Sequence, residues 1–202
     1  MNNVYNMNER KVIVIDIDGV LNNYPIEFVA WVNEEYSLNY NCISELKNDP
    51  NYKEIKHAYR MSGYKKELSV IENVSKFFDY IYQKNIAVWV VTSRPAINKV
   101  INDTKYWLAN NDIFYDRIYF TDSKYSVLKK ETDVDFLAII EDDVDIINTY
   151  ISGGVKAPIF HMDIHNNHSN NIFKEENIIL CHSWKEIKPH FEILINDLDG
   201  DV

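Results

Sequence analysis

The 202-residue chain is 46% hydrophobic and carries 31 acidic against 21 basic residues, a net charge of −10. This balance supports a sizeable core in one domain and argues against a nucleic-acid backbone or an anionic membrane as a partner, because both bind through a basic surface. Two distant cysteines, the lack of a membrane-length apolar stretch and a polar segment at residues 1–10 lead us to expect a reduced, cytoplasmic protein.

The first predicted element is a strand at Val12–Ile15, whose four branched apolar residues are typical of a strand buried on both faces of a parallel sheet. Asp16 and Asp18 follow it, and Gly19 lets the chain turn sharply. Because the carboxyl ends of parallel strands face the ligand crevice, both acids are expected at the mouth of a site. The alternative is a simple polar exit from a strand. A similar motif at 197–200 is interpreted as an acidic chain end.

The segment after the first strand is predicted to be helical over about Pro25–Tyr36 and again over about Pro50–Met61. At roughly forty residues, the segment 24–67 is long for an ordinary crossover between two strands. We therefore expect residues 24–67 to form a small helical cap over the site. Residues 1–23 and 68–202 are expected to form the core domain.

The rest of the chain alternates between buried apolar runs and amphipathic stretches, which predicts strands that alternate with helices. The predicted strands are Ile86–Val91, Ile118–Phe120, Phe136–Ile140, Ala157–Phe160 and Ile178–Leu180. The predicted helices span about residues 70–85, 95–110, 124–130, 144–151 and 184–195. Residues 165–171 are expected to be a loop. This order favours a parallel sheet covered by helices on both faces.

The predicted strand Ile86–Val91 is followed directly by Thr92, Ser93, Arg94 and Pro95. Pro95 is expected to begin the next helix, with Ser93 or Arg94 as its cap. A hydroxyl and a backbone amide at a helix start can both hold a phosphoryl oxygen, so Thr92 is a candidate phosphate ligand. Ser93 and Arg94 are candidates for substrate contact, and a plain helix cap is the alternative for Thr92.

Charged residues follow the next two strands. Lys124 lies just past the third strand, where its charge can neutralise a nucleophile and a phosphate. Its rivals for that role are Lys129 and Lys130. The fourth strand ends in three acids, Glu141, Asp142 and Asp143. Like charges this close are costly unless a cation compensates them, and the buried apolar lead-in favours a metal over a solvated acidic helix start.

This combination of residues suits phosphoryl transfer. A carboxylate at a strand end, such as Asp16, can attack a phosphorus atom and form an aspartyl-phosphate. A second acid, such as Asp18, can protonate the leaving alkoxide and later activate water. Two carboxylates beside an anionic ester require a cation, and hard oxygen ligands favour Mg²⁺.

Four motifs at successive strand ends, VIVIDIDGV, VVTSR, a lysine near Lys124 and IIEDD, resemble the haloacid dehalogenase (HAD) superfamily of phosphohydrolases over nearly the whole chain. The resemblance implies a Rossmann-like three-layer α/β/α sandwich with a mostly parallel sheet. It also implies that Asp16 is the nucleophile, Asp18 the general acid/base, Thr92 the phosphoryl ligand and Lys124 a charge stabiliser. Mg²⁺ would then be held by Asp16, the main-chain carbonyl of Asp18, and Asp142.

Glu141 departs from the two aspartates that many members of the superfamily carry at this motif. The residues leave open whether Asp142 or Asp143 contacts the metal, although Asp142 is closer to the strand end. The layout most resembles small bacterial 5′-nucleotidases of the superfamily, which implies a (deoxy)nucleoside monophosphate as the substrate. The alternatives are a phosphatase of a sugar phosphate or another small metabolite, and a catalytically silent binding protein. The presence of both Asp16 and Asp18 speaks against a silent protein, which needs no second acid.

The cap is expected to select the substrate, because the core motifs handle only the phosphate. It contains Trp31, Tyr59, Arg60 and Tyr64. The aromatic rings are able to stack on a nucleobase, and Arg60 to reach a second anionic group. The alternative is that these residues serve helix packing and solvated charge.

Overall fold

The computed structural model describes residues 11–164 and 176–199. Its strands are β1 (Val12–Ile15), β2 (Ala87–Thr92), β3 (Arg117–Phe120), β4 (Phe136–Glu141), β5 (Ile159–Met162) and β6 (Ile178–Cys181). They form one six-stranded sheet in the order β3-β2-β1-β4-β5-β6, and all of its neighbouring strands pair in parallel. The polar segment 1–10 and the expected loop at 165–171 lie outside the described residues.

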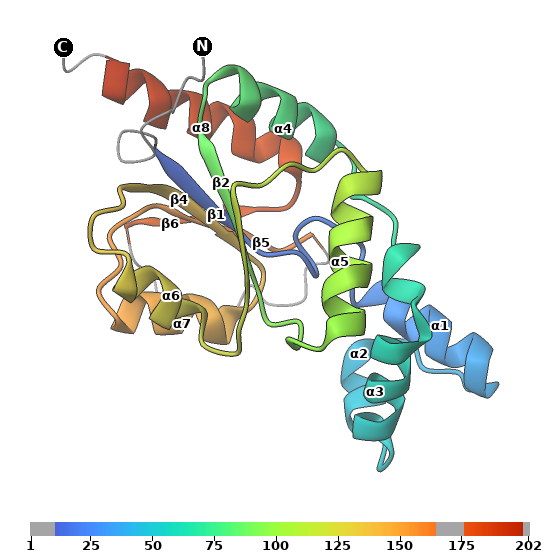
Figure 1. Cartoon of the computed structure of the whole chain (residues 1–202). Helices are drawn as coiled ribbons and strands as arrows, with labels where there is room; N and C mark the ends of the chain where they lie inside the picture. Colours follow the sequence, from blue (N-terminus) through green and yellow to red (C-terminus); the bar gives the residue numbers. More distant parts are fainter. Residues whose placement is uncertain (1–10, 165–175, 200–202) are drawn as a thin grey trace.

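Helices cover both faces of this sheet (Figure 1). They are α4 (Val74–Gln83), α5 (Asn98–Asn110), α6 (Lys124–Lys130), α7 (Val144–Ser152) and α8 (Trp184–Asp199). The alternation of side chains along β1 explains the two layers: Ile13 and Ile15 join the apolar cluster formed with α4, α5 and α8, whereas Val14 joins the cluster formed with α6 and α7. This arrangement confirms the predicted three-layer α/β/α sandwich.

The chain inserts a group of short helices between β1 and α4. They are α1 (Ile26–Tyr36), α2 (Ile43–Lys47), α3 (Tyr52–Ser62) and the 3-10 helix η2 (Tyr64–Lys66). These helices lie to one side of the sheet (Figure 1) and have an apolar cluster of their own, which includes Phe28, Trp31 and Tyr59. We call residues 24–67 the cap. The sequence predicted α1 and α3, but α2 and η2 are too short to show a helical period.

Two helices begin later than the sequence predicted. α5 begins at Asn98 with Ile97 as its N-cap residue, so neither Ser93 nor Arg94 caps a helix, and the helix start expected at Pro95 is wrong. The backbone N–H of Ile97 donates to the carbonyl of Pro95 at 2.8 Å, so residues 95–97 form a tight turn before the helix begins. α4 begins at Val74, because Asn73 before it has a left-handed φ of 72°.

Two other elements also differ in extent. β5 runs over Ile159–Met162, about two residues later than expected. α8 continues to Asp199, so the sequence Asp197-Leu198-Asp199 lies in a helix and does not follow a strand. Within the described ranges, the helices all lack the length and apolar character that a bilayer span requires.

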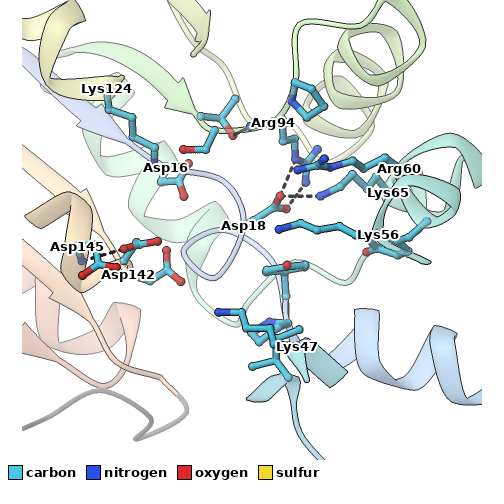
Figure 2. A pocket seen from close by; sticks show the side chains of 18 of the residues that line it. Asp16, Asp18, Lys47, Lys56, Arg60, Lys65, Arg94, Lys124, Asp142 and Asp145 are labelled. Atoms are coloured by element: carbon cyan, nitrogen blue, oxygen red, sulfur yellow. Dashed lines mark hydrogen bonds and ion pairs between the residues drawn. The ribbon is translucent and has the colours of Figure 1, made fainter. Parts of the chain in front are cut away.

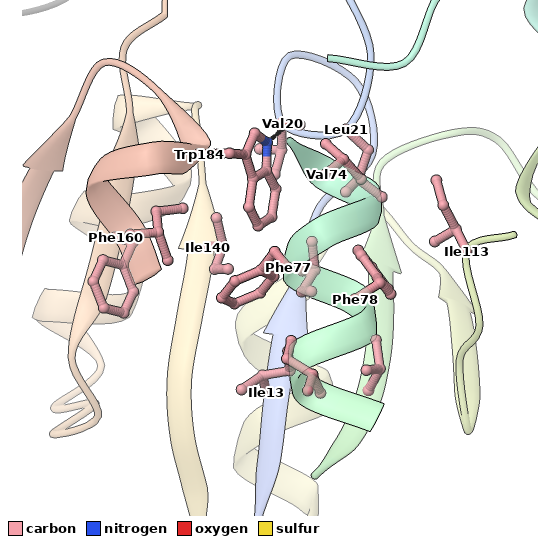
Figure 3. Close-up of a cluster of buried hydrophobic side chains, with 14 of the residues drawn as sticks. Ile13, Val20, Leu21, Val74, Phe77, Phe78, Ile113, Ile140, Phe160 and Trp184 are labelled. Atoms are coloured by element: carbon pink, nitrogen blue, oxygen red, sulfur yellow. Dashed lines mark hydrogen bonds between the residues drawn. The ribbon is translucent and has the colours of Figure 1, made fainter. Parts of the chain in front are cut away.

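The largest apolar cluster lies between the sheet and the helices α4 and α8 (Figure 3). Phe77 of α4 is 2% exposed, and its ring centre lies 4.8 Å from that of Trp184 and 5.2 Å from that of Phe191. The indole Nε1 of Trp184 donates a hydrogen bond of 2.8 Å to the carbonyl oxygen of Val20. The last helix of the chain therefore holds the loop that follows the first strand.

Replacement of Phe77 by alanine is expected to lower the free energy of unfolding by about 3–5 kcal/mol, because it leaves a cavity between α4 and α8. Urea denaturation followed by circular dichroism measures the change. Tyr82 on the same helix is 74% exposed, and Tyr82→Ala is the matched control, with an expected loss below about 1 kcal/mol. Equal losses in the two variants would show that α4 does not pack as described.

Candidate functional site

The carboxyl ends of β1, β2 and β4 meet at one edge of the sheet, beside the start of α6. The strand order reverses between the neighbours β1 and β4, and open α/β sheets bind ligands at such a point. A cavity of about 480 Å³ lies here. Asp16, Asp18 and Asp142 line it from the core, and side chains of the cap line it from the opposite side (Figure 2).

Asp16 directly follows β1, and its backbone N–H donates to a carbonyl of β4 at 3.0 Å. The ammonium of Lys124, the first residue of α6, lies 2.9 Å from Asp16 Oδ1 and 2.7 Å from Glu141 Oε2. Burial alone lowers the pKa of Lys124, but the two carboxylates raise it above its ordinary value, so the ammonium stays charged. Burial raises the pKa of Asp16 and of Glu141, and Lys124 opposes this effect.

The rival lysines do not share this environment. Lys129 and Lys130 end α6 and are exposed, whereas Lys124 is buried. The structure therefore brings Lys124 to the site, as the sequence predicted.

Asp142 follows β4 and lies beside Asp16. One carboxylate oxygen from each of Asp16, Glu141 and Asp142 lies within 4.8 Å of the others. Burial, together with the two neighbouring acids, raises the pKa of Asp142 well above its ordinary value. Gly19 makes room for this carboxylate: a Cβ at Gly19 would overlap it, and the backbone φ of 85° there suits glycine.

These acids fit a divalent cation. Three carboxylates share one region with a single ammonium, which leaves an excess of buried negative charge, and carboxylate oxygens are hard ligands that suit Mg²⁺. Glu141 is already occupied, because it accepts hydrogen bonds from Lys124 at 2.7 Å and from the backbone N–H of Asp143 at 3.3 Å. Asp16 and Asp142 are therefore the better candidate metal ligands.

Asp143 has a different role from its two neighbours. Its carboxylate caps α7 by accepting the backbone N–H groups of Asp145 at 2.9 Å and Ile146 at 3.3 Å. This cap satisfies two donors at the helix start, so the side chain is held away from a metal-binding role.

The carboxylate of Asp18 is held by two cations. Lys65 Nζ donates to Asp18 Oδ2 at 2.6 Å, Arg94 Nε donates to the same oxygen at 3.1 Å, and Arg94 Nη2 and Asn22 Nδ2 donate to Oδ1. Burial raises the pKa of Asp18, but Arg94 and Lys65 outweigh it and hold the pKa well below its usual range. Burial and the charge of Arg94 lower the pKa of Lys65 to about 8. Because Lys65 belongs to η2, this contact joins the cap to the core.

The residues at the end of β2 and just after it line the cavity, but they do not start a helix as predicted. Thr92 ends β2, and α5 starts only at Asn98, so the expectation that the Thr92 amide lies at a helix start is wrong. The Thr92 hydroxyl lines the cavity and accepts the backbone N–H of Arg94 at 3.3 Å. Ser93 also lines the cavity and is exposed. Arg94 is buried, and its Nη1 donates to Thr104 Oγ1 at 3.0 Å.

The cap brings polar and charged side chains to the opposite wall. Those that line the cavity are Tyr24, Lys47, Lys56, Tyr59, Arg60 and Lys65. Of the four cap residues considered as substrate contacts, Tyr59 and Arg60 line this cavity, whereas Trp31 and Tyr64 line a separate hollow. Tyr59 is buried in the apolar cluster of the cap, as the packing alternative expects.

Sequence reasoning missed the lysines of the cap. Lys56 had a signal, since it precedes Arg60 by one helical turn and so shares a helix face with it. Lys65 had none, because its partner Asp18 is 47 residues away in the sequence.

Comparison with known proteins identifies the fold. No protein-family model matches the sequence, and no curated protein matches it significantly. The structure resembles that of a candidate HAD-hydrolase, YfnB of Bacillus subtilis, crystallised with magnesium (TM-score 0.63, 10% identity, 90% of this chain and 98% of that chain). It also resembles a predicted phosphatase of Clostridium acetobutylicum (0.64, 14%, 91% and 99%) and a candidate β-phosphoglucomutase of Thermotoga maritima (0.59, 18%, 95% and 100%). The chain thus has the fold of HAD-superfamily hydrolases.

Gly19→Ala is expected to weaken Mg²⁺ binding by about tenfold or more, because the added methyl group displaces Asp142. Isothermal titration calorimetry with MgCl₂ measures the affinity. Gly154→Ala is the matched control, since Gly154 has a similar φ of 81° but no atom within 4 Å of the added Cβ. Both variants should lose about 1–2 kcal/mol of stability through backbone strain. Unchanged Mg²⁺ affinity in Gly19→Ala would contradict the assignment of Asp142.

Proposed function

We propose that this protein is a Mg²⁺-dependent phosphomonoester hydrolase that acts through an aspartyl-phosphate on Asp16. The observation that carries the proposal is the position of Asp16, whose carboxylate lines the cavity at the end of β1, 2.9 Å from the buried ammonium of Lys124. A carboxylate held in this way is suited to attack a phosphorus atom that enters the cavity. The phosphatase and hydrolase names of the proteins with the same fold support the proposal.

The transferred phosphoryl group carries negative charge that its surroundings must stabilise. Lys124 supplies an ammonium that its two carboxylate partners keep protonated. The hydroxyl of Thr92 lines the same cavity and is able to donate to a phosphoryl oxygen. In the proposed reaction Thr92 binds the phosphoryl group, Lys124 offsets its charge, and Ser93 contacts the substrate at the exposed rim.

The candidate ligands of Mg²⁺ are the carboxylates of Asp16 and Asp142 together with the main-chain carbonyl of Asp18. A bound Mg²⁺ would supply Lewis-acid chemistry, polarising the phosphate and offsetting the negative charge that Lys124 leaves. The overlap that any side chain at Gly19 would make with Asp142 supports this assignment, because it shows space reserved for that carboxylate.

Asp18 is the proposed general acid/base. With Arg94 and Lys65 bound to it, its carboxylate is ionised, but the same two cations weaken it as the base that takes a proton from water in the second half of the reaction. To donate a proton in the first half, Asp18 must first gain one. An arriving phosphate competes with Asp18 for these two cations and so raises its pKa. Arg94, predicted to contact substrate, thereby acts by holding Asp18.

We further propose a (deoxy)nucleoside monophosphate as the substrate, so that the protein is a 5′-nucleotidase. Tyr24, which lines the cavity and is only half-buried, supports this, since an aromatic ring can contact a nucleobase. A sugar phosphate is the second candidate, favoured by the many charged side chains of the cavity wall and by the likeness to the candidate β-phosphoglucomutase.

Asp16→Asn is expected to lower phosphate release from p-nitrophenyl phosphate by roughly 1,000-fold or more, because the amide cannot act as the nucleophile. EDTA should abolish the wild-type activity and added Mg²⁺ should restore it. Asp122 also follows a strand end but is exposed, so Asp122→Asn is the control and should keep wild-type activity. Wild-type rates in a folded Asp16→Asn protein would refute the nucleophile assignment.

A panel of nucleoside monophosphates and sugar monophosphates tests the substrate class. The nucleotidase proposal expects the highest kcat/KM for a nucleotide, and a Tyr24→Ala variant should lose more of kcat/KM for nucleotides than for p-nitrophenyl phosphate. Sugar phosphates that outperform every nucleotide by a wide margin would favour the second candidate.

A further inference from the structure

The cap wall of the cavity carries three cations that the proposed chemistry does not use. Lys47 comes from the end of α2, and Lys56 and Arg60 come from one face of α3, one turn apart. All three point toward the cavity in Figure 2, on the side opposite Asp16 and Asp142. A chain with a net charge of −10 thus presents positive charge on one wall of this cavity.

These cations differ from Lys65 in their partners. Lys65 is buried and bound to Asp18. Among the described residues, no carboxylate lies within ion-pair distance of Lys47, Lys56 or Arg60. The ammonium of Lys56 lies 5.5 Å from the ring centre of Tyr52. Burial and then the charge of Arg60 lower the pKa of Lys56, and this effect outweighs the opposing charges of Asp18 and Asp143.

The phosphoryl group that reacts at Asp16 has its own partners in Lys124 and Thr92 on the core wall. It therefore does not account for the cations of the opposite wall, which lines the same cavity of about 480 Å³. An arginine and two lysines on the same wall of a cavity suit a dianionic phosphate better than a single carboxylate, because a phosphate offers three oxygens and twice the charge.

We propose that the substrate carries a second phosphate group, which Lys47, Lys56 and Arg60 bind while its first phosphate reacts at Asp16. The proposal rests on the proposed function, since it places the reacting phosphate on the core wall. The substrate proposed above is thereby revised: the nucleotide or sugar phosphate that the cavity prefers carries a second phosphate, and the cap binds it more tightly than the corresponding monophosphate.

The test compares each bisphosphate with its monophosphate in two pairs: fructose 1,6-bisphosphate with fructose 6-phosphate, and adenosine 3′,5′-bisphosphate with AMP. In at least one pair the bisphosphate should have the higher kcat/KM. Lys56→Met and Arg60→Met should each lower kcat/KM for that bisphosphate by about tenfold or more while leaving p-nitrophenyl phosphate unchanged, as expected for the loss of a charge-assisted hydrogen bond.

Lys53→Met is the matched control. Lys53 is exposed on the same helix and its loss also removes one positive charge, so an equal effect of Lys53→Met would attribute the preference to general electrostatics and overturn the proposal. The proposal is also overturned if the monophosphates match the bisphosphates in both pairs, or if the preference survives in the Lys56→Met/Arg60→Met variant.

A binding measurement separates this proposal from the proposed function. Asp16→Asn keeps the cap intact, and the increase of its melting temperature with each compound reports binding without turnover. A larger increase with the bisphosphate, lost in Asp16→Asn combined with Lys56→Met and Arg60→Met, supports the second phosphate site even if wild-type protein releases no phosphate. Suppose instead that Asp16→Asn shows equal increases with both compounds while the wild-type protein hydrolyses p-nitrophenyl phosphate. This outcome rejects the second phosphate site and leaves the proposed hydrolase function standing.

Discussion

The ammonium of Lys124, buried between Asp16 and Glu141, is the interaction on which the site depends. It ties the start of α6 to the ends of β1 and β4, where the strand order of the sheet reverses. Without it, two carboxylates would face each other in a region from which water is largely excluded, at a cost of several kcal/mol. Glu141 is paired with this lysine, whereas Asp142 lines the cavity.

A second charged network joins the cap to the core. Asp18 accepts hydrogen bonds from Arg94 in the loop after β2 and from Lys65 in the cap, so the position of the cap and the charge at the reacting end of the cavity are linked. The two walls of the cavity then have opposite character. Acids gather on the core wall, where a metal fits, and cations gather on the cap wall, where an anion fits.

The sequence predicted the sheet and most of the core wall because each relevant residue directly follows a buried apolar run, as Asp16 and Asp142 do. It predicted the start of α5 wrongly, because a proline that is favourable in a first helical turn also suits the tight turn that residues 95–97 make here. It could not predict Lys65, because that lysine is marked only by a partner distant in the chain. Side-chain partners of this kind depend on how the cap packs, which periodicity does not encode.

The hydrogen bond from Trp184 to Val20 has a consequence for how the protein is made. Its partners are 164 residues apart, so the loop that carries Asp18 and Gly19 gains this support only after the ribosome has released most of the chain. Synthesis places Asp16 early, yet the loop beside it cannot make this hydrogen bond until Trp184 has been added. A nascent chain that stops before Trp184 therefore holds every acid of the cavity while lacking the indole that fixes the loop beneath them.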